Sequence, residues 1–250
     1  MKPQGPTFLA QEVKTSGLTT EALKDWARRH GWKILVADAD YRPHTDAHSA
    51  GVAILAREWL GLGWPPGCGP TTKEGRVIIG MLECPFLPPM LIASIYLKTG
   101  IGGAAPYNLE LLRFVGQVTS VHRLPWILGG DFQMSPDAIN KTLFPQTARA
   151  QILADDNPMG TCRRSFGVST IDFFIVSDDL ASAAQSAAVY QHPAIPDHRP
   201  VRLVLPANTG DMKKHVIRGV QQLPNDPVFG PRSHRRTGDR PATPPSVPSG

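Results

Sequence analysis

Apolar residues along this chain occur mainly in short runs bounded by glycine, proline and polar residues, a pattern typical of buried β-strands. Two longer segments, 19–30 and 106–122, have the apolar spacing of helices. Thr19 or Thr20 is expected to cap the first helix, and Gly31 to end it. The short runs predict strands at residues 7–13, 32–37, 50–57, 76–83, 90–97, 125–128, 148–154, 170–176, 187–191 and 201–205.

The order of these elements indicates the fold class. Strands outnumber helices and the two types do not alternate, so the pattern favours two stacked sheets flanked by helices over a doubly wound parallel sheet. Residues 84–89, CPFLPP, are expected to form a turn that interrupts the sheet, because proline cannot donate a hydrogen bond to a neighbouring strand. The 23 glycines and 25 prolines agree with many short elements and many turns.

The positive charge of the chain is concentrated near its carboxyl end. The formal net charge is +5, but residues 1–206 hold 19 basic and 18 acidic side chains, whereas residues 207–250 hold 7 and 3. The composition also shifts after residue 206 to proline, arginine, serine and glycine, which predicts a disordered tail after one domain at 1–206. Such a tail either serves solubility or contacts nucleic acid.

The cysteines and the apolar segments exclude several protein classes. Cys68, Cys84 and Cys162 are odd in number and widely spaced, so their spacing supports neither a disulfide framework nor a zinc site. The amino-terminal residues lack the pattern of a secretory signal, and four residues, Glu83 and three prolines, interrupt the longest apolar stretch, 77–97. We therefore expect a soluble, intracellular protein without a membrane span. A nuclear location stays open, and the sequence does not identify protein partners.

Acidic residues stand at the ends of several expected strands. Glu12, Asp131 and Asp172 each adjoin apolar residues, and Asp197 and His198 come just before the last strand. A carboxylate beside a core costs free energy to desolvate unless a cation or a donor meets it. These side chains could converge on one cation, and His198 could donate a ring N–H to Asp172. Taken singly, they could also be solvated strand ends, a turn or a helix cap.

Five segments of the chain follow one another in a recognisable order. They are LAQEV (9–13), SIYLKTG (94–100), GGDFQMSPD (129–137), STIDFFIVS (169–177) and PDHRPVRLVL (196–205). In this order they resemble the signature blocks of the endonuclease/exonuclease/phosphatase superfamily, and they are closest in style to the endonucleases of non-LTR retrotransposons and to apurinic-site endonucleases. The resemblance spans about residues 7–205 and implies a four-layer α/β sandwich, in which two mixed sheets pack face to face with helices outside.

The resemblance implies a metal-dependent phosphodiester hydrolase that acts on DNA or RNA. Glu12 would be the principal ligand of Mg²⁺, with Mn²⁺ as an alternative ion, and Asp197 would complete the metal region. A hard cation held by carboxylates neutralises the charge that develops when water attacks a phosphodiester. A phosphatase or a phospholipid phosphodiesterase of the same superfamily is the alternative enzyme.

The resemblance also implies catalytic roles. Tyr96 would contact the substrate phosphate, and Asp131 would orient or deprotonate the attacking water. Asp172 would orient His198, which would bind or protonate a phosphate oxygen. The amide of Gln133 would hold the attacking water near Asp131.

The chain departs from the family pattern at three places. Gln133 stands where the family has asparagine, which would place its amide about 1 Å away from the usual position, and Pro196 stands where serine is most common. Only eleven residues precede Glu12, so the opening strand of the family is expected to be missing. These departures leave open a third reading, an inactive remnant that binds nucleic acid through its tail.

Overall fold

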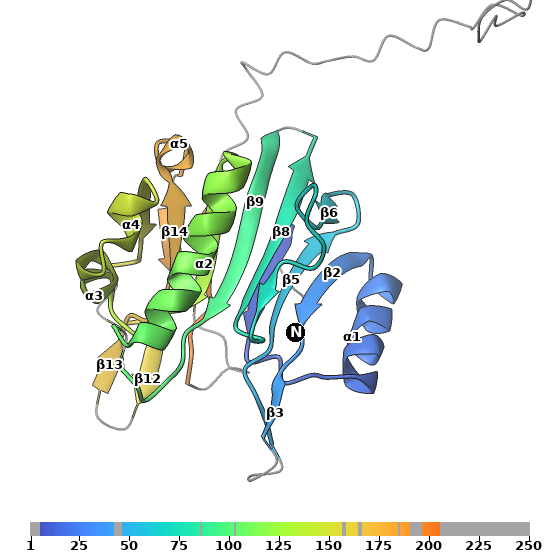
Figure 1. The fold of residues 1–250 in the computed structure, drawn as a ribbon, viewed down its shortest axis with the longest axis horizontal. Helices are drawn as coiled ribbons and strands as arrows, with labels where there is room; N and C mark the ends of the chain where they lie inside the picture. Colours follow the sequence, from blue (N-terminus) through green and yellow to red (C-terminus); the bar gives the residue numbers. More distant parts are fainter. Residues whose placement is uncertain are drawn as a thin grey trace, which may run out of the picture. The chain divides into compact units, whose positions relative to one another are not determined.

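A computed structural model describes residues 6–42, 47–85, 87–102, 104–156, 159–164, 167–184, 186–190 and 197–205. The tail expected at 207–250 lies outside these residues. Two sheets make up most of the described structure, and we call them the large sheet and the small sheet (Figure 1). No helix among the described residues is long and apolar enough to cross a membrane.

The large sheet has seven strands and is mixed. Its main order is β11-β14-β10-β9-β8-β6, and β7 also pairs with β8. Only β9 and β10 are parallel, because the helix α2, Pro106–His122, joins them as a crossover connection. The strands are β6 (Gly61–Gly63), β7 (Thr72–Lys73), β8 (Val77–Cys84), β9 (Leu87–Tyr96), β10 (Trp126–Asp131), β11 (Ala150–Leu153) and β14 (Asp172–Ser177).

The small sheet has three antiparallel strands in the order β1-β5-β2. They are β1 (Thr7–Gln11), β2 (Trp32–Ala37) and β5 (Val52–Arg57). Alternate residues of β5 point to opposite faces, as strand geometry requires. Val52 and Ile54 face the large sheet, whereas Ala53 and Leu55 face the helix α1, Leu18–Arg29, through Ala27.

The remaining described elements are short. Three two-stranded pairs are β3 (Asp40–Arg42) with β4 (Ala47–Ser49), β12 (Cys162–Arg164) with β13 (Gly167–Ser169), and β15 (Ser186–Val189) with β16 (Val201–Val204). Three short helices are α3 (Pro136–Lys141), α4 (Phe144–Thr147) and α5 (Asp178–Ala181).

The helices cover the outer faces of the two sheets. α2 lies across the large sheet and α1 lies against the small sheet (Figure 1). Leu111, Leu112 and Val115 of α2 pack on buried residues of β8 and β9, such as Ile79 and Leu91. A second core fills the space between the sheets. The expected sandwich of two sheets with outer helices is therefore confirmed.

Two local expectations are wrong. The N-cap of α1 is Gly17, with a φ of 52°, and not Thr19 or Thr20. The hydroxyl of Thr20 is instead used for tertiary structure, since it donates to Asp38 over 2.6 Å. The end of the helix matches the expectation, because Gly31 follows its C-cap with a φ of 71°.

The second correction concerns the prolines at 84–89. Pro88 and Pro89 do not lie in a turn; they belong to β9, which already begins at Leu87. Both are exposed, and the register of β8 against β9 shifts between Leu82 and Cys84, just before them. A proline near the start of a strand and beside such an irregularity breaks few hydrogen bonds between strands.

Candidate active site

Three of the expected site residues lie in one row across the large sheet. Tyr96 is the register partner of Asp131 on the parallel strand, and Asp131 is the partner of Asp172 on the antiparallel strand. Each stands at one end of its strand, and all three strands are adjacent. Tyr96 belongs to the core between the sheets, so the row lies on the face that the small sheet covers. Register therefore brings together residues that are far apart in the sequence.

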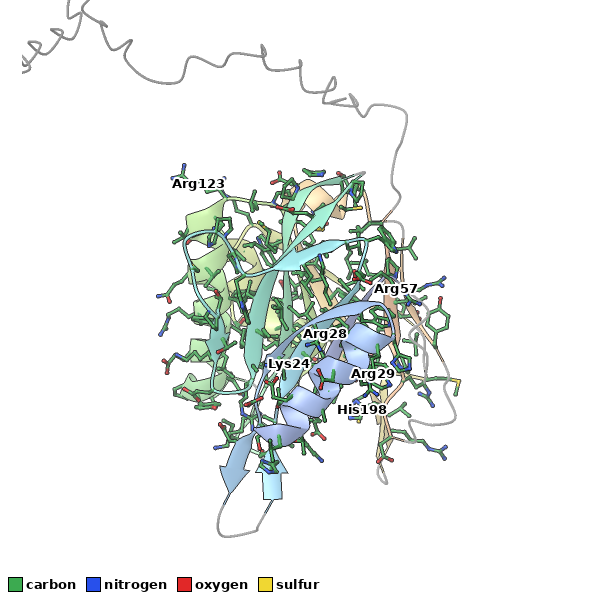
Figure 2. The ribbon with its side chains drawn as sticks, turned by 90° about the vertical axis from the view of Figure 1, so that its right-hand side faces the viewer. Lys24, Arg28, Arg29, Arg57, Arg123 and His198 are labelled. Atoms are coloured by element: carbon green, nitrogen blue, oxygen red, sulfur yellow. The ribbon has the colours of Figure 1, made fainter. Side chains whose placement is uncertain are left out.

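His198 joins this row through Asp172. Its Nδ1 lies 3.0 Å from Asp172 Oδ2 and 3.2 Å from Oδ1. This hydrogen bond raises the pKa of His198, although burial acts in the opposite direction. When Nδ1 donates to Asp172, the other nitrogen, Nε2, is left to act on a substrate. The imidazole is 37% exposed, and its place in the molecule is labelled in Figure 2.

The Asp131 carboxylate is buried, with 4% of the residue exposed. Burial, followed by the negative charge of Asp172, raises the pKa of Asp131 to about 7. The Gln133 backbone N–H donates to Oδ1 over 2.9 Å, and the Gln133 side-chain amide donates to Oδ2 over 2.5 Å. Gln133 has a φ of 50°, and its side chain folds back onto Asp131. A carboxyl with a pKa near neutrality can accept a proton from water.

Glu12 follows the small-sheet strand β1 and reaches across to the row. The Tyr96 hydroxyl donates to Glu12 Oε1, and Lys14 Nζ lies 3.4 Å from Oε2. Burial would raise the pKa of Glu12, but the Tyr96 bond and the Lys14 charge together lower it. Burial and the bond to Glu12 raise the pKa of Tyr96 to about 12, so its phenol keeps its proton. Glu12 is thus a carboxylate beside a neutral donor.

The Gln11 and Ser94 side chains fix this contact between the sheets. Gln11 Nε2 donates to the Ser94 hydroxyl over 2.9 Å, and that hydroxyl donates to the Ala10 carbonyl over 3.1 Å. Ser94 is fully buried, two residues before Tyr96 on β9. The sequence reasoning did not single out this pair, although Gln11 belongs to the LAQEV segment.

Asp197 is exposed, and its backbone carbonyl accepts the Arg163 N–H over 2.8 Å. The potential ligand atoms of Asp131, Asp172 and His198 lie within 4.8 Å of one another. Within the described residues, this is the group of three that could hold an ion, and it contains neither Glu12 nor Asp197. The donor set fits a hard divalent cation, because two facing carboxylates need positive charge between them.

Thr161 is a site residue that the sequence reasoning missed. It is fully buried, and its hydroxyl oxygen accepts the backbone N–H groups of Ile171 and Asp172, each over 2.9 Å. Its carbonyl accepts the Arg199 N–H over 2.7 Å. Thr161 therefore ties the start of β14 to the segment that carries His198. No local pattern marks it, because all its partners are distant in the sequence.

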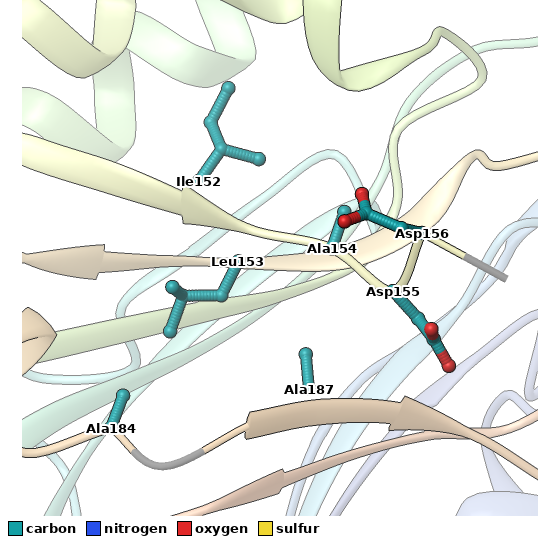
Figure 3. Close-up of a pocket in the computed structure, with 7 residues that line it drawn as sticks. All are labelled: Ile152, Leu153, Ala154, Asp155, Asp156, Ala184 and Ala187. Atoms are coloured by element: carbon teal, nitrogen blue, oxygen red, sulfur yellow. The ribbon is translucent and has the colours of Figure 1, made fainter.

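A separate hollow lies at the end of β11 and contains none of these site residues (Figure 3). It is lined by Leu153, Asp155 and Asp156 on one side and by Ala184 and Ala187 on the other. Its two carboxylates, Asp155 and Asp156, do not belong to a group of three or more potential metal ligands.

The sequence matches no protein-family model and no curated protein. Solved structures do match the fold. The 3′ phosphatase NExo from Neisseria bound to a product DNA hairpin has a TM-score of 0.57 and 15% identity, and the match covers 80% of this chain and 89% of that one. An AP endonuclease from Leishmania major has a TM-score of 0.59 and 11% identity, over 79% of this chain and 77% of that one.

The endonuclease domain of TRAS1, a telomere-specific non-LTR retrotransposon, is similar to the same extent. Its TM-score is 0.54 with 12% identity, and the match covers 80% of this chain and 98% of that domain. These structures are of the endonuclease/exonuclease/phosphatase superfamily. The chain described here has the fold of that superfamily, as the five segments of its sequence predict.

Proposed function

We propose that this protein is a Mg²⁺-dependent phosphodiester hydrolase that acts on nucleic acid. The observation that carries the proposal is the row Tyr96, Asp131 and Asp172, which Glu12 meets from one side and His198 from the other. Phosphodiester hydrolysis needs a group that accepts a proton from water, donors for the phosphate oxygens and neutralising charge. The candidate site offers a residue that can accept the proton, donors for the phosphate oxygens, and ligands for a cation that would neutralise the charge.

Each residue has a role that its surroundings support. Asp131, with its raised pKa, accepts the proton of the attacking water. Asp172 holds His198 Nδ1 and leaves Nε2, which lies 3.6 Å from Cys162 Sγ, as the nitrogen that would meet a phosphate oxygen. Tyr96, which stays protonated, donates to a second phosphate oxygen. Mg²⁺, or Mn²⁺, would supply charge neutralisation of the developing phosphorane when held by Glu12 and Asp197.

Nucleic acid is the substrate class that we favour. The three similar structures are a 3′ phosphatase bound to a product DNA hairpin, an AP endonuclease and a retrotransposon endonuclease domain. On α1, Lys24 and Arg28 already pair with Glu21 and Asp25, each over 2.7 Å (Figure 2). The basic residues of 207–250 would therefore supply much of the attraction to phosphates, and this attraction would be salt-dependent.

The contact of the Gln133 amide with Asp131 is expected to make hydrolysis slow. The amide already bonds Asp131 Oδ2 at 2.5 Å, and this oxygen is one that the attacking water would use. Water must therefore displace the amide or share the carboxylate with it. This contact is also the observation that favours the second candidate, an inactive remnant that binds nucleic acid without cleaving it.

The experiment that tests the proposal incubates the full chain with an abasic duplex, a supercoiled plasmid and a 3′-phosphorylated duplex. Cleavage or phosphate release should require Mg²⁺ and stop with a chelator. Asp131→Asn should lower the rate by about 10²- to 10⁴-fold, the usual contribution of a general base. Asp179→Asn removes an exposed carboxylate of α5 and is the matched control. If folded protein cleaves none of the substrates above the chelator level, the enzyme proposal fails and the remnant stands.

A further inference from the structure

The nitrogen of His198 that faces away from Asp172 contacts a side chain without a role in the proposed hydrolysis. Cys162 Sγ lies 3.6 Å from His198 Nε2, while Nδ1 lies 3.0 Å from Asp172 Oδ2. Cys162 is 2% exposed and forms no disulfide. The imidazole thus stands between a thiol and a carboxylate, and the spacing of the cysteines along the chain gives no sign of this.

The backbone sets this pairing. Cys162 and His198 form an antiparallel β-bridge, although they are 36 residues apart. Hydrogen bonds flank the bridge on both sides, from Arg163 N–H to the Asp197 carbonyl over 2.8 Å and from Arg199 N–H to the Thr161 carbonyl over 2.7 Å. The two side chains are therefore held side by side by four neighbouring residues rather than by a flexible loop.

The distance between the two atoms fits a tetrahedral zinc ion. Zinc binds thiolate at about 2.3 Å and imidazole at about 2.0 to 2.1 Å, and a tetrahedral angle between such bonds separates sulfur from nitrogen by about 3.5 to 3.6 Å. Cys162 Sγ and His198 Nε2 are 3.6 Å apart. A metal-binding histidine usually donates its other ring N–H to a carboxylate, as His198 can do with Asp172.

We propose that Cys162 and His198 form a binding site for a thiophilic divalent cation such as Zn²⁺, and that Zn²⁺ bound there inhibits the hydrolase. Thiolate and imidazole ligands select Zn²⁺ over Mg²⁺, which prefers oxygen. The carboxylates of Asp131 and Asp172 add negative charge, since their oxygens lie within 4.8 Å of an imidazole nitrogen. Zn²⁺ on Nε2 removes the nitrogen that the proposed function assigns to the phosphate, so the inhibitory part rests on that function.

The ion can enter from the side of His198. The imidazole is 37% exposed, whereas Cys162 is buried. Binding converts the Cys162 thiol to a zinc thiolate and releases one proton to solvent, with no change of oxidation state. The site therefore needs no co-reactant besides the metal ion.

A second cysteine–histidine pair provides an internal control. Cys68 Sγ lies 3.7 Å from His122 Nε2, but Cys68 is exposed and the pair joins a loop to the end of α2. Cys68→Ser with Cys84→Ser leaves Cys162 as the sole cysteine of the full chain. Adding Cys162→Ser to this variant gives the matched protein without thiols. Far-ultraviolet circular dichroism checks that both are folded.

Titration with Cd²⁺, a spectroscopic substitute for Zn²⁺, tests binding through the ultraviolet charge-transfer band of a cadmium thiolate. The band should saturate near one equivalent in the protein that keeps Cys162 and should be missing after Cys162→Ser. In a Zn²⁺ competition, Asp172→Asn should weaken the affinity by about 10-fold or more. Equal Zn²⁺ affinity with and without Cys162, or a cadmium band that the unmodified chain shows and the variant with Cys162 as its sole cysteine lacks, overturns the site.

Inhibition is measured on the same two proteins with Mg²⁺ in large excess. Zn²⁺ should lower cleavage at least about 10-fold more strongly when Cys162 is present, and added Mg²⁺ should not restore it. Equal inhibition of both proteins overturns the inhibitory part. If neither protein cleaves, yet the cadmium band depends on Cys162, the proposed hydrolysis fails and the metal site stands.

Discussion

The large and small sheets differ in how continuously their strands are hydrogen-bonded, and the candidate site has residues from both sides. The large sheet is hydrogen-bonded without a break from β11 to β6 and carries Tyr96, Asp131 and Asp172. Across from it, β1 pairs with β5 and β16 pairs with β15, and among the described residues no pairing joins the two groups. Yet β1 packs on β9 and β10, and β16 packs on β14, the next strand of the large sheet.

This difference divides the site residues into two groups. Three sit on strands that have neighbours on both sides, whereas Glu12 follows β1 and His198 precedes β16, each on an edge strand. Edge strands leave N–H and C=O groups without strand partners and open more readily. We infer that the large sheet fixes the row of carboxylates and that β1 and β16, the edge strands next to Glu12 and His198, open more readily than the strands of the large sheet. The expected absence of an opening strand stays a prediction.

The largest effect on stability should come from adding a side-chain atom between two strands of the large sheet. A Cβ added to Gly130 on β10 would collide with the Ile95 carbonyl on β9, which is backbone and cannot move aside. Gly130→Ala should lower the free energy of unfolding by about 3 kcal/mol, measured by denaturant titration. Gly63→Ala, on β6 of the same sheet and with open space around it, should change it by less than about 0.5 kcal/mol. Equal effects would contradict the described packing of β9 on β10.

The next effect concerns the carboxylate that the large sheet holds. Asparagine at position 133 is too short to repeat the Gln133 contact with Asp131 Oδ2, and it is more favourable than glutamine at a φ of 50°. Gln133→Asn should raise the rate of cleavage about 10- to 100-fold, as misplacement by one methylene costs rate. The assay is the Mg²⁺-dependent cleavage described above. An unchanged rate in an active protein would show that the Gln133 amide does not compete with water.

Amide hydrogen exchange compares the two sheets directly. Amides of β1 and β16 should exchange at least about 10-fold faster than those of β9 and β10, because local opening costs less at an edge. Protection of β1 and β16 equal to that of β9 would refute the easier opening of the two edge strands.

The smallest effect is on pH dependence through the edge residue His198. Asp172 raises the pKa of His198 above the unfolded value of about 6.5, so the pair stabilises the fold fully below that value and loses its effect as pH rises through the folded pKa. Asp172→Asn should lower the pKa of His198 in an NMR titration. It should also destabilise the protein more at about pH 5.5 than at about pH 9. The same destabilisation at both values would mean that His198 and Asp172 do not interact.

Local sequence patterns were sufficient for much of the fold and part of the site. Short apolar runs predicted β2, β5, β8, β9, β10 and β14, because strands buried in a sheet consist of consecutive apolar residues that are visible in the sequence itself. Charged residues beside such runs, notably Asp131 and Asp172, stood out because a carboxylate in an apolar setting needs a partner. The error at the cap of α1 arose where a distant contact, that of Thr20 with Asp38, engages the expected cap residue. The error at Pro88 and Pro89 arose where a register shift between β8 and β9 lets a strand begin with prolines.

Only the tertiary structure decided how these residues meet. The register that places Tyr96, Asp131 and Asp172 in one row depends on lateral strand pairing, which joins residues far apart in the sequence. The same holds for the contact of Cys162 with His198, where a bridge across 36 residues creates a pair that no spacing along the chain reveals. The contact of the Gln133 amide with Asp131, and the φ of 50° at Gln133, which this residue type does not favour, were likewise visible only in the structure.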